Sequence, residues 1–251
     1  STHTWLTLRS SVAIPLTTQE RDDGVRGLQD CTFRMEDGSA ANCWIEAPEQ
    51  LLVRKFIPRD ATVLELGARY GTTSCEISYA LGNSGKQLAV EPDESVWNAL
   101  ELNREKHSCN FAVHKGIVES SGWVGLSRKY AYGTQTGKVG QTKQADSVPS
   151  LSFLEAEAKY GLKFDTLLID CEGCLSRLLK RNPGMLDGIQ LILVEADGPA
   201  RRDAYKDPFK FIKREGFDIV DSFMEKERVK APSTWKGNIL HYAFQRKRRS
   251  R

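Results

Sequence analysis

The sequence predicts a doubly wound α/β fold in which helices cover both faces of a mostly parallel sheet. From residue 61 onward, short apolar segments alternate with segments of helical periodicity, which is typical of parallel strands connected by helices. A turn containing Gly67 and Gly71 follows the first apolar segment. The last two apolar segments have no clear helix between them, so we expect these terminal strands to pair antiparallel.

Five apolar segments are predicted to form the parallel strands. They lie at residues 62–66, 87–90, 110–114, 165–169 and 189–194, and the antiparallel pair lies at 217–220 and 238–244. Helices are predicted at 49–56, 72–81, 93–104, 150–160 and 175–181, with another around Tyr205 that ends at Gly216. The Gly-, Ser- and Thr-rich residues 116–147 are expected to form strand fragments and loops.

The chain divides into an N-terminal β-hairpin extension at 1–46, a main α/β domain at 47–245 and a basic tail at 246–251. In the extension, Trp5 to Leu8 is a predicted strand and Asp37-Gly38 is a hairpin turn signal. The tail is expected to be a solvated end. It carries five positive charges, without which the net charge of +3 becomes −2. The body is therefore not a basic nucleic-acid surface.

Length and composition fit one large globular domain. The 251 residues are 40 % hydrophobic, and no run of about 18 apolar residues predicts a membrane span. No signal peptide is visible, and a cytoplasmic protein with reduced thiols is expected because six cysteines are too few for a disulfide scaffold of this length. Cys171 and Cys174 have CxxC spacing, but no second Cys/His pair completes a zinc site, so neither a zinc nor a redox role is expected.

The turn after the first strand has the composition of a ligand-binding loop. Gly67 and Gly71 allow a ligand to approach the backbone closely, and the next helix begins with free N–H groups. Their GxxxG spacing does not match the GxGxxG fingerprint of dinucleotide-binding proteins, which disfavours an NAD-dependent dehydrogenase. Glu65 would repel a pyrophosphate, whereas it suits a ligand that carries an ammonium or sulfonium group.

A second acidic residue ends the next strand. Glu91 lies 24 residues after Gly67, and in doubly wound nucleotide-binding folds an acid at this place binds the ribose hydroxyls. A strand-end glutamate alone is usually only solvated, but its interval from the glycine loop favours the functional interpretation.

These segments resemble the class I S-adenosyl-L-methionine (SAM)-dependent methyltransferases. Glu65-Leu-Gly-Ala-Arg-Tyr-Gly71 is similar to their first SAM-binding motif, and Glu91 to the ribose-binding acid of the second. Leu167-Leu-Ile-Asp170-Cys-Glu172-Gly173 resembles the Ile-Asp-Val-Glu-Gly signature of FkbM-type methyltransferases. The similarity covers residues 44–223. It departs from the family at Arg69-Tyr70, where an asparagine is common, and at Cys171, which replaces the usual valine.

The resemblance implies a Rossmann-like sheet of seven strands in the order 3-2-1-4-5-7-6, with the last strand antiparallel. SAM would then lie across the carboxyl ends of the first two strands, with Gly116 near the adenine. The implied cofactor-binding residues are Glu65, Gly67, Ala68, Tyr70, Gly71, Thr72, Glu91, Pro92, Gly116, Ile117 and Asp170.

Acidic residues end the fourth and fifth strands, where the resemblance places the methyl acceptor. Asp170, Glu172 and Glu195 are the catalytic candidates, since a carboxylate can remove the proton of an acceptor hydroxyl. Alternatively, Asp170 with Glu195 or Asp197 could hold a divalent cation. We assign no metal ligands, because sequence alone places no third one. Glu172 could instead only cap the next segment or pair with a nearby arginine.

Two of the four histidines lie in predicted strands. His114 ends the third strand near the expected cofactor. His241 lies in the middle of a terminal strand and is expected to be packed rather than catalytic.

The expected function is O-methylation of a hydroxyl on a sugar or small metabolite. Alternatives are an N- or protein-methyltransferase of the same fold, and a non-catalytic scaffold that binds SAM or a partner. The negative charge of the body disfavours a nucleic-acid substrate. The sequence gives neither the acceptor nor the oligomeric state.

Overall fold

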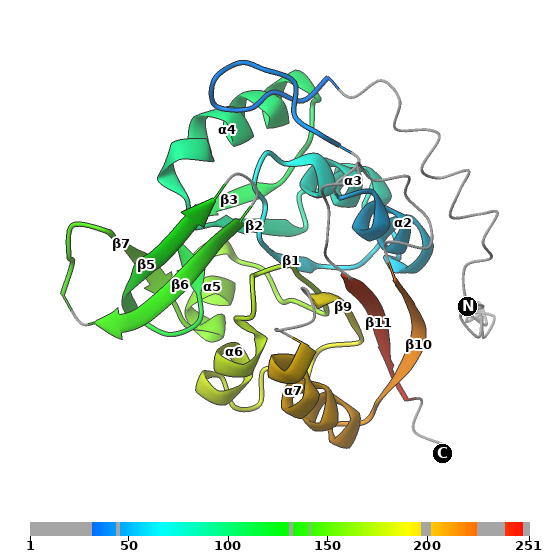
Figure 1. The fold of residues 1–251 in the computed structure, drawn as a ribbon. Helices are drawn as coiled ribbons and strands as arrows, with labels where there is room; N and C mark the ends of the chain where they lie inside the picture. The colour runs from blue at the N-terminus through cyan, green and yellow to red at the C-terminus, as the bar shows by residue number, and fades with distance from the viewer. Residues whose placement is uncertain are drawn as a thin grey trace, which may run out of the picture.

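The computed structural model describes residues 32–43, 46–130, 133–140, 142–196, 202–224 and 239–247 (Figure 1). The predicted strand from Trp5 to Leu8, residues 248–251 of the tail and the candidate cation ligand Asp197 lie outside the described residues.

A seven-stranded sheet forms the centre of the protein and confirms the predicted fold. Its strands are β1 (Val63–Leu66), β2 (Gln87–Glu91), β3 (Ala112–Lys115), β8 (Thr166–Ile169), β9 (Leu191–Ala196), β10 (Phe217–Met224) and β11 (Leu240–Arg246). Across the sheet they follow the order β10-β11-β9-β8-β1-β2-β3. The first five are parallel, whereas β11 is antiparallel to both β9 and β10. This is the expected order, with the expected antiparallel terminal pair.

Helices cover both faces of the sheet (Figure 1). One face carries α2 (Ala47–Phe56), α3 (Thr72–Ala80), the 3₁₀ helix η1 (Glu94–Val96) and α4 (Trp97–Lys106), and the other carries α5 (Phe153–Tyr160), α6 (Leu175–Arg181) and α7 (Arg202–Arg214). Local signals set several of the boundaries. Ser152 and Glu155 form a capping box at the start of α5, and the Asp93 side chain accepts a hydrogen bond from Ser95 N in η1.

The parallel strands are apolar along their length because both of their faces are buried. Leu64 and Leu167 pack in the cluster with α5, α6 and α7, while Val63 and Leu193 pack in the cluster with α2 and α3. Each such side chain stabilises the fold by about 1.5–3 kcal/mol when fully buried. The two layers of helices leave the carboxyl ends of the strands available for a site.

A second, four-stranded sheet is built mainly from residues 116–147, in which only strand fragments and loops were expected, and its strand at 147–151 replaces the start of the helix predicted at 150–160. It contains β4 (Ile117–Val118), β5 (Gly122–Tyr130), β6 (Gly133–Gly140) and β7 (Ser147–Leu151), in the order β4-β7-β5-β6. Strands β5 and β6 form a long antiparallel hairpin, which extends beside the main sheet in Figure 1. The many glycine, serine and threonine residues of this segment conceal the apolar alternation by which strands are recognised.

Both described ends of the chain are attached to the main domain. A turn at Glu36 to Ser39 joins the bridged residues Arg34 and Ala40, in agreement with the predicted hairpin signal. The Asn103 side chain binds the backbone N–H and carbonyl of Arg34, each at 2.9 Å. At the other end, Arg246 belongs to β11 rather than to a separate tail, and its guanidinium donates to the carbonyls of Ile189, Glu215 and Leu186.

The cysteines correct the expectation of reduced thiols. Disulfides join Cys75 to Cys109, between α3 and the segment after α4, and Cys171 to Cys174, immediately after β8. Cys43 is also disulfide-bonded. The expectation was wrong because sequence spacing does not show which cysteines the fold brings into contact.

Among the described residues, no helix is both long and apolar enough to cross a membrane.

Candidate functional site

A cavity lies at the carboxyl ends of β1, β2 and β8, where a doubly wound sheet binds its ligands. The second sheet contributes to its wall through β4 and β6. Seven of the residues predicted from the sequence line this cavity: Gly67, Glu91, Pro92, Gly116, Ile117, Asp170 and Glu172. The structure therefore brings together the glycine loop, the strand-end glutamate and the acidic segment after β8, which are separated by many residues in the chain.

The glycine loop bends sharply between β1 and α3. Gly67 has φ +102° and Gly71 has φ +83°, which are conformations that favour glycine. The backbone amides of Gly67 and Ala68 both donate to the carbonyl of Val90, at 3.0 and 3.1 Å. The loop is thereby held against the end of β2, next to Glu91.

Glu91 lies at the centre of this arrangement and is only 3 % exposed. Its carboxylate accepts hydrogen bonds from the backbone N–H of Arg69 at 2.8 Å and of Asp93 at 2.7 Å. Burial raises the pKa of the Glu91 carboxyl to about 7, against the lowering effect of those hydrogen bonds and of the Arg69 charge. The carboxylate is thus held rigidly at the wall of the cavity, with lone pairs suited to accept from hydroxyl groups.

Arg69 and Thr134 complete the wall beside Glu91. The Arg69 guanidinium forms a buried salt bridge with Asp93, with Nη1 and Oδ2 separated by 2.9 Å. Thr134 of β6 is 8 % exposed, and its hydroxyl lies 3.4 Å from the same Asp93 oxygen. The hairpin of the second sheet therefore reaches the cavity through Thr134, a residue that the sequence reasoning missed.

The acidic segment after β8 forms a tight turn along the opposite side of the cavity. Asp170 N donates to the carbonyl of Leu66 at 2.9 Å, which continues the pairing between β8 and β1. Glu172 and Gly173 have φ values of +55° and +91°, and the disulfide from Cys171 to Cys174 closes the turn just before α6. Asp170 and Glu172 both line the cavity, together with both cysteines.

Five of the predicted cofactor-binding residues do not line the cavity: Glu65, Ala68, Tyr70, Gly71 and Thr72. Tyr70, Thr72, Gly71 and Glu65 instead lie behind or beside the glycine loop. The Tyr70 hydroxyl donates to Glu36 at 2.7 Å, the Thr72 hydroxyl donates to Glu46, and Gly71 precedes the first turn of α3. Glu65 is fully buried and accepts a hydrogen bond from the Gln87 amide at 2.9 Å. Burial raises its pKa to about 8.

The arginines of α6 pair with Glu119, the residue that follows β4. Glu119 is 1 % exposed, and it accepts from Arg177 Nε at 3.0 Å and also from Arg181. This ion-pair group ties the segment after β4 to α6. Glu119 ends the stretch Val113-His-Lys-Gly-Ile-Val-Glu, which resembles the FkbM-type family and was expected near the adenine, but its pairing with the arginines of α6 was not predicted.

His114 lies in β3 and does not line the cavity, although its position at the end of the third predicted strand was expected to bring it near the cofactor. It is 3 % exposed, and its Nδ1 lies 3.2 Å from the Tyr160 hydroxyl. Burial lowers its pKa to about 4, so the ring is neutral near pH 7.

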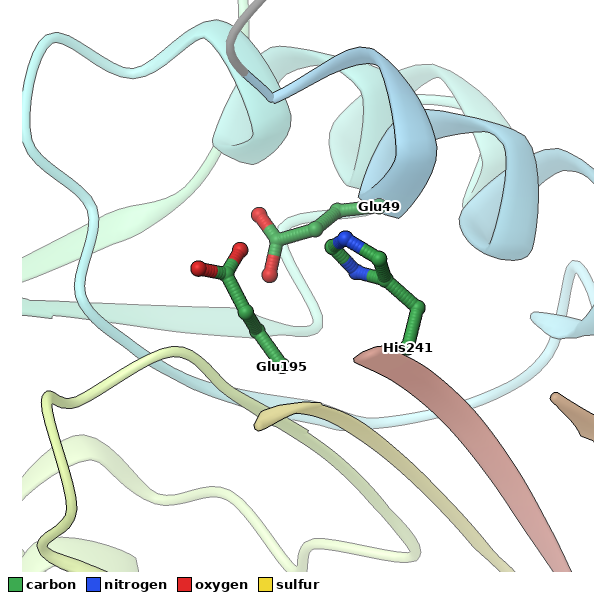
Figure 2. A group of neighbouring side chains, drawn as sticks. All are labelled: Glu49, Glu195 and His241. Carbon is green, nitrogen blue, oxygen red and sulfur yellow. The ribbon is translucent and has the colours of Figure 1, made fainter. Parts of the chain in front are cut away.

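Glu195 does not line the cavity but belongs to a separate group with Glu49 and His241 (Figure 2). Glu49 is in the first turn of α2, Glu195 is near the end of β9, and His241 is near the start of β11. Burial lowers the pKa of His241 to about 3. The sequence reasoning named Glu195 as catalytic and His241 as packed, and it gave Glu49 no role. The expected strand order makes β9 and β11 neighbours, but it does not give the register that pairs Glu195 with His241 or the packing of α2 on them.

Comparisons with known proteins give similarity of fold. Neither a protein-family model nor a curated protein sequence matches this chain. A putative O-methyltransferase from Klebsiella pneumoniae is similar, at 12 % identity and a TM-score of 0.48, over 96 % of this chain and 93 % of that one. An O-methyltransferase from Bacillus cereus in complex with SAH is similar at 15 % identity and a TM-score of 0.46, over 94 % of each chain. A protein of the NADB-Rossmann superfamily from Streptococcus agalactiae is 14 % identical, with a TM-score of 0.45, over 78 % of this chain and 67 % of that one.

Proposed function

We propose that the protein is a SAM-dependent methyltransferase of the FkbM type that methylates a hydroxyl of a sugar or small metabolite. The observation that carries this proposal is the cavity at the carboxyl ends of β1, β2 and β8, with Glu91 buried in its wall beside the glycine loop. In doubly wound folds this is the place where nucleotides bind, and an acid there accepts a hydrogen bond from the ribose.

The residues present fit SAM in the chemistry they offer. Glu91 would hold the ribose, and Pro92, Gly116 and Ile117 would form the less polar wall around the adenine. Gly67 would place its backbone against the ligand. Bound SAM supplies an electrophilic methyl group on a sulfonium. Because Glu65 and the residues from Tyr70 to Thr72 lie outside the cavity wall, we propose that they support the loop rather than contact the cofactor.

The acidic turn supplies the proposed acceptor side of the cavity. Asp170 lines the cavity next to the glycine loop, so its carboxylate is suited to orient an acceptor hydroxyl and to remove its proton. Glu172 lines the same wall and is the second candidate. The hairpin of β5 and β6 reaches the cavity through Thr134, on the Glu91 side, and would limit the space that is left for the acceptor.

A cytoplasmic location remains a prediction. The disulfides of the described residues are more typical of an oxidising compartment.

The proposal is tested by incubating the full chain with SAM and a panel of sugars, small hydroxylated metabolites, amines and peptides, and by measuring release of S-adenosylhomocysteine. We expect release with a hydroxylated acceptor, and mass spectrometry should then show a methyl ether on the product. Release only with amines or peptides would indicate an N- or protein-methyltransferase. SAM binding without turnover on any acceptor would contradict the enzyme and favour a binding scaffold.

A further inference from the structure

Glu49, Glu195 and His241 form a three-residue group outside the cavity, which we call the EEH group (Figure 2). Glu195 and His241 are direct partners in the antiparallel pairing of β9 with β11. On these strands, alternate residues such as Leu193 and Ala243 pack in the cluster with α2, so Glu195 and His241 face that helix as well. Glu49 extends from the first turn of α2 toward them.

The three side chains converge closely. One potential ligand atom of each residue lies within 4.8 Å of those of the other two. Atoms bound to one ion, each at about 2.1 Å, lie up to roughly 4.2 Å apart, so small side-chain rotations bring the group to binding distance. His241 is 1 % exposed and Glu49 is 4 % exposed, so these two side chains have little freedom to point elsewhere, while Glu195 is half-buried.

His241 provides the second, independent observation. Neither of its ring nitrogens has a hydrogen-bond partner among the described residues, although a buried polar atom without a partner costs about 1–3 kcal/mol. Its ring stacks on Phe223, with centroids 5.3 Å apart, which fixes its direction toward the two carboxylates. A histidine that served only for packing would not need two acidic neighbours at the same place.

We propose that the EEH group binds one divalent transition-metal ion of the Mn²⁺ class. Two carboxylates and one imidazole leave the remaining coordination positions to water or ligand. Carboxylate oxygens suit Mg²⁺, Ca²⁺ and Mn²⁺, while the imidazole nitrogen favours a transition metal over the first two. The positive ion would also offset the repulsion between two carboxylates held close together.

The EEH group lies beside the proposed methyl-transfer site but does not depend on it. Ile169 pairs with Val194 across β8 and β9, so the following residues, Asp170 and Glu195, end neighbouring strands at the same edge of the sheet. Asp170 lines the cavity, and Glu195 belongs to the EEH group. An ion at Glu195 would therefore be next to the acceptor side, yet binding of the metal alone can be measured whether or not the protein transfers methyl groups.

Mn²⁺ is the probe, added to the full chain after treatment with a chelator. Isothermal titration should show one Mn²⁺ per chain, and the same experiment with Mg²⁺ should show binding at least about tenfold weaker. Glu49→Gln, Glu195→Gln and His241→Asn should each weaken Mn²⁺ binding by at least about tenfold, because each removes a ligand. His107→Asn is the matched control: this histidine stacks on Phe33 near the surface, and its loss should leave Mn²⁺ binding unchanged.

Pulsed electron paramagnetic resonance provides a readout that a merely structural role would not change. The bound Mn²⁺ should show coupling to an imidazole nitrogen, which disappears in His241→Asn and persists in His107→Asn. Circular dichroism and the thermal midpoint show whether each variant folds. If His241→Asn does not fold, the conservative Glu195→Gln is used to test the site in its place. Absence of Mn²⁺ binding up to about 1 mM, or binding that survives Glu195→Gln in a folded protein, would overturn the proposal.

Discussion

Gly67 and Asp170 contact each other so closely that Gly67 has no space for a side chain. An ideal Cβ on Gly67 would lie 1.8 Å from the Asp170 carbonyl oxygen, and the φ of Gly67 is +102°. This contact joins the glycine loop after β1 to the acidic turn after β8. The two segments that supply the proposed cofactor and acceptor sides of the cavity therefore fix each other's position, before any ligand is considered.

Gly67→Ala is expected to lower the free energy of unfolding by at least about 3 kcal/mol, because backbone strain and overlap with Asp170 add together. Urea denaturation followed by circular dichroism measures this loss. Gly161→Ala is the matched control, since Gly161 has φ +65° but no atom within 4 Å of its ideal Cβ. The control should lose only about 1–2 kcal/mol. Equal losses in the two variants would show that the contact with Asp170 is not the cause.

The buried Glu65 should make stability depend on pH. Its pKa is about 8 in the folded protein, against an ordinary value of about 4.5, so between these pH values the folded state holds a proton that the unfolded chain releases. A raised pKa gives stability that is present below pH 4.5 and lost as the pH rises through about 8.

Glu65→Gln should remove this part of the pH dependence, because glutamine does not ionise. The measurement is urea denaturation of both proteins near pH 5 and near pH 8.5, roughly either side of the transition. The variant should gain stability relative to wild type at the higher pH. An identical pH dependence in the two proteins would mean that Glu65 is ionised in the folded state.

The disulfide from Cys171 to Cys174 predicts a specific labelling pattern. When the protein is unfolded without reductant and treated with an alkylating reagent, both cysteines should remain unlabelled, and mass spectrometry should find their peptide two hydrogens lighter than the dithiol. After reduction both should be labelled. Labelling of either cysteine without reduction would restore the earlier expectation of free thiols in the acidic turn.

Asp170→Asn separates cofactor binding from chemistry. If Asp170 orients or deprotonates the acceptor hydroxyl, the variant should keep SAM affinity within a few-fold and lose about 10²-fold or more in turnover. Glu172→Gln, in the same turn, is the comparison, and a larger loss there would transfer the role to Glu172. Normal turnover in both variants would leave catalysis to proximity and orientation around the methyl group.

Much of the fold could be predicted from the sequence because its signals are local. The strands at 62–66 and 165–169 are recognised from their own apolar residues, and Asp93 was recognised as a helix cap. The second sheet could not be predicted in this way. Strand β6 contains three glycines and two threonines among its eight residues, and its pairing with β5 depends on tertiary contact rather than on an apolar pattern.

The site residues that follow directly after a predicted strand could be predicted from the sequence. Gly67, Glu91 and Asp170 meet at one cavity because parallel strands present their carboxyl ends at the same edge. Glu65 illustrates the limit: it precedes the loop in sequence, but alternation along β1 directs its side chain toward Gln87 and not into the cavity. Glu49 and His241 are brought to Glu195 by the register of β9 with β11 and by the packing of α2, for which a single sequence contains no local signal.

The central claim is that Glu91 binds the ribose of SAM, and isothermal titration tests it most directly. Wild type should bind SAM and S-adenosylhomocysteine with micromolar dissociation constants and should not bind NAD. Glu91→Ala should weaken SAM binding by about 1–3 kcal/mol, while the exposed neighbour Glu94→Ala should have no effect. Absence of SAM binding by the wild-type chain, or wild-type affinity in a folded Glu91→Ala, would contradict the account.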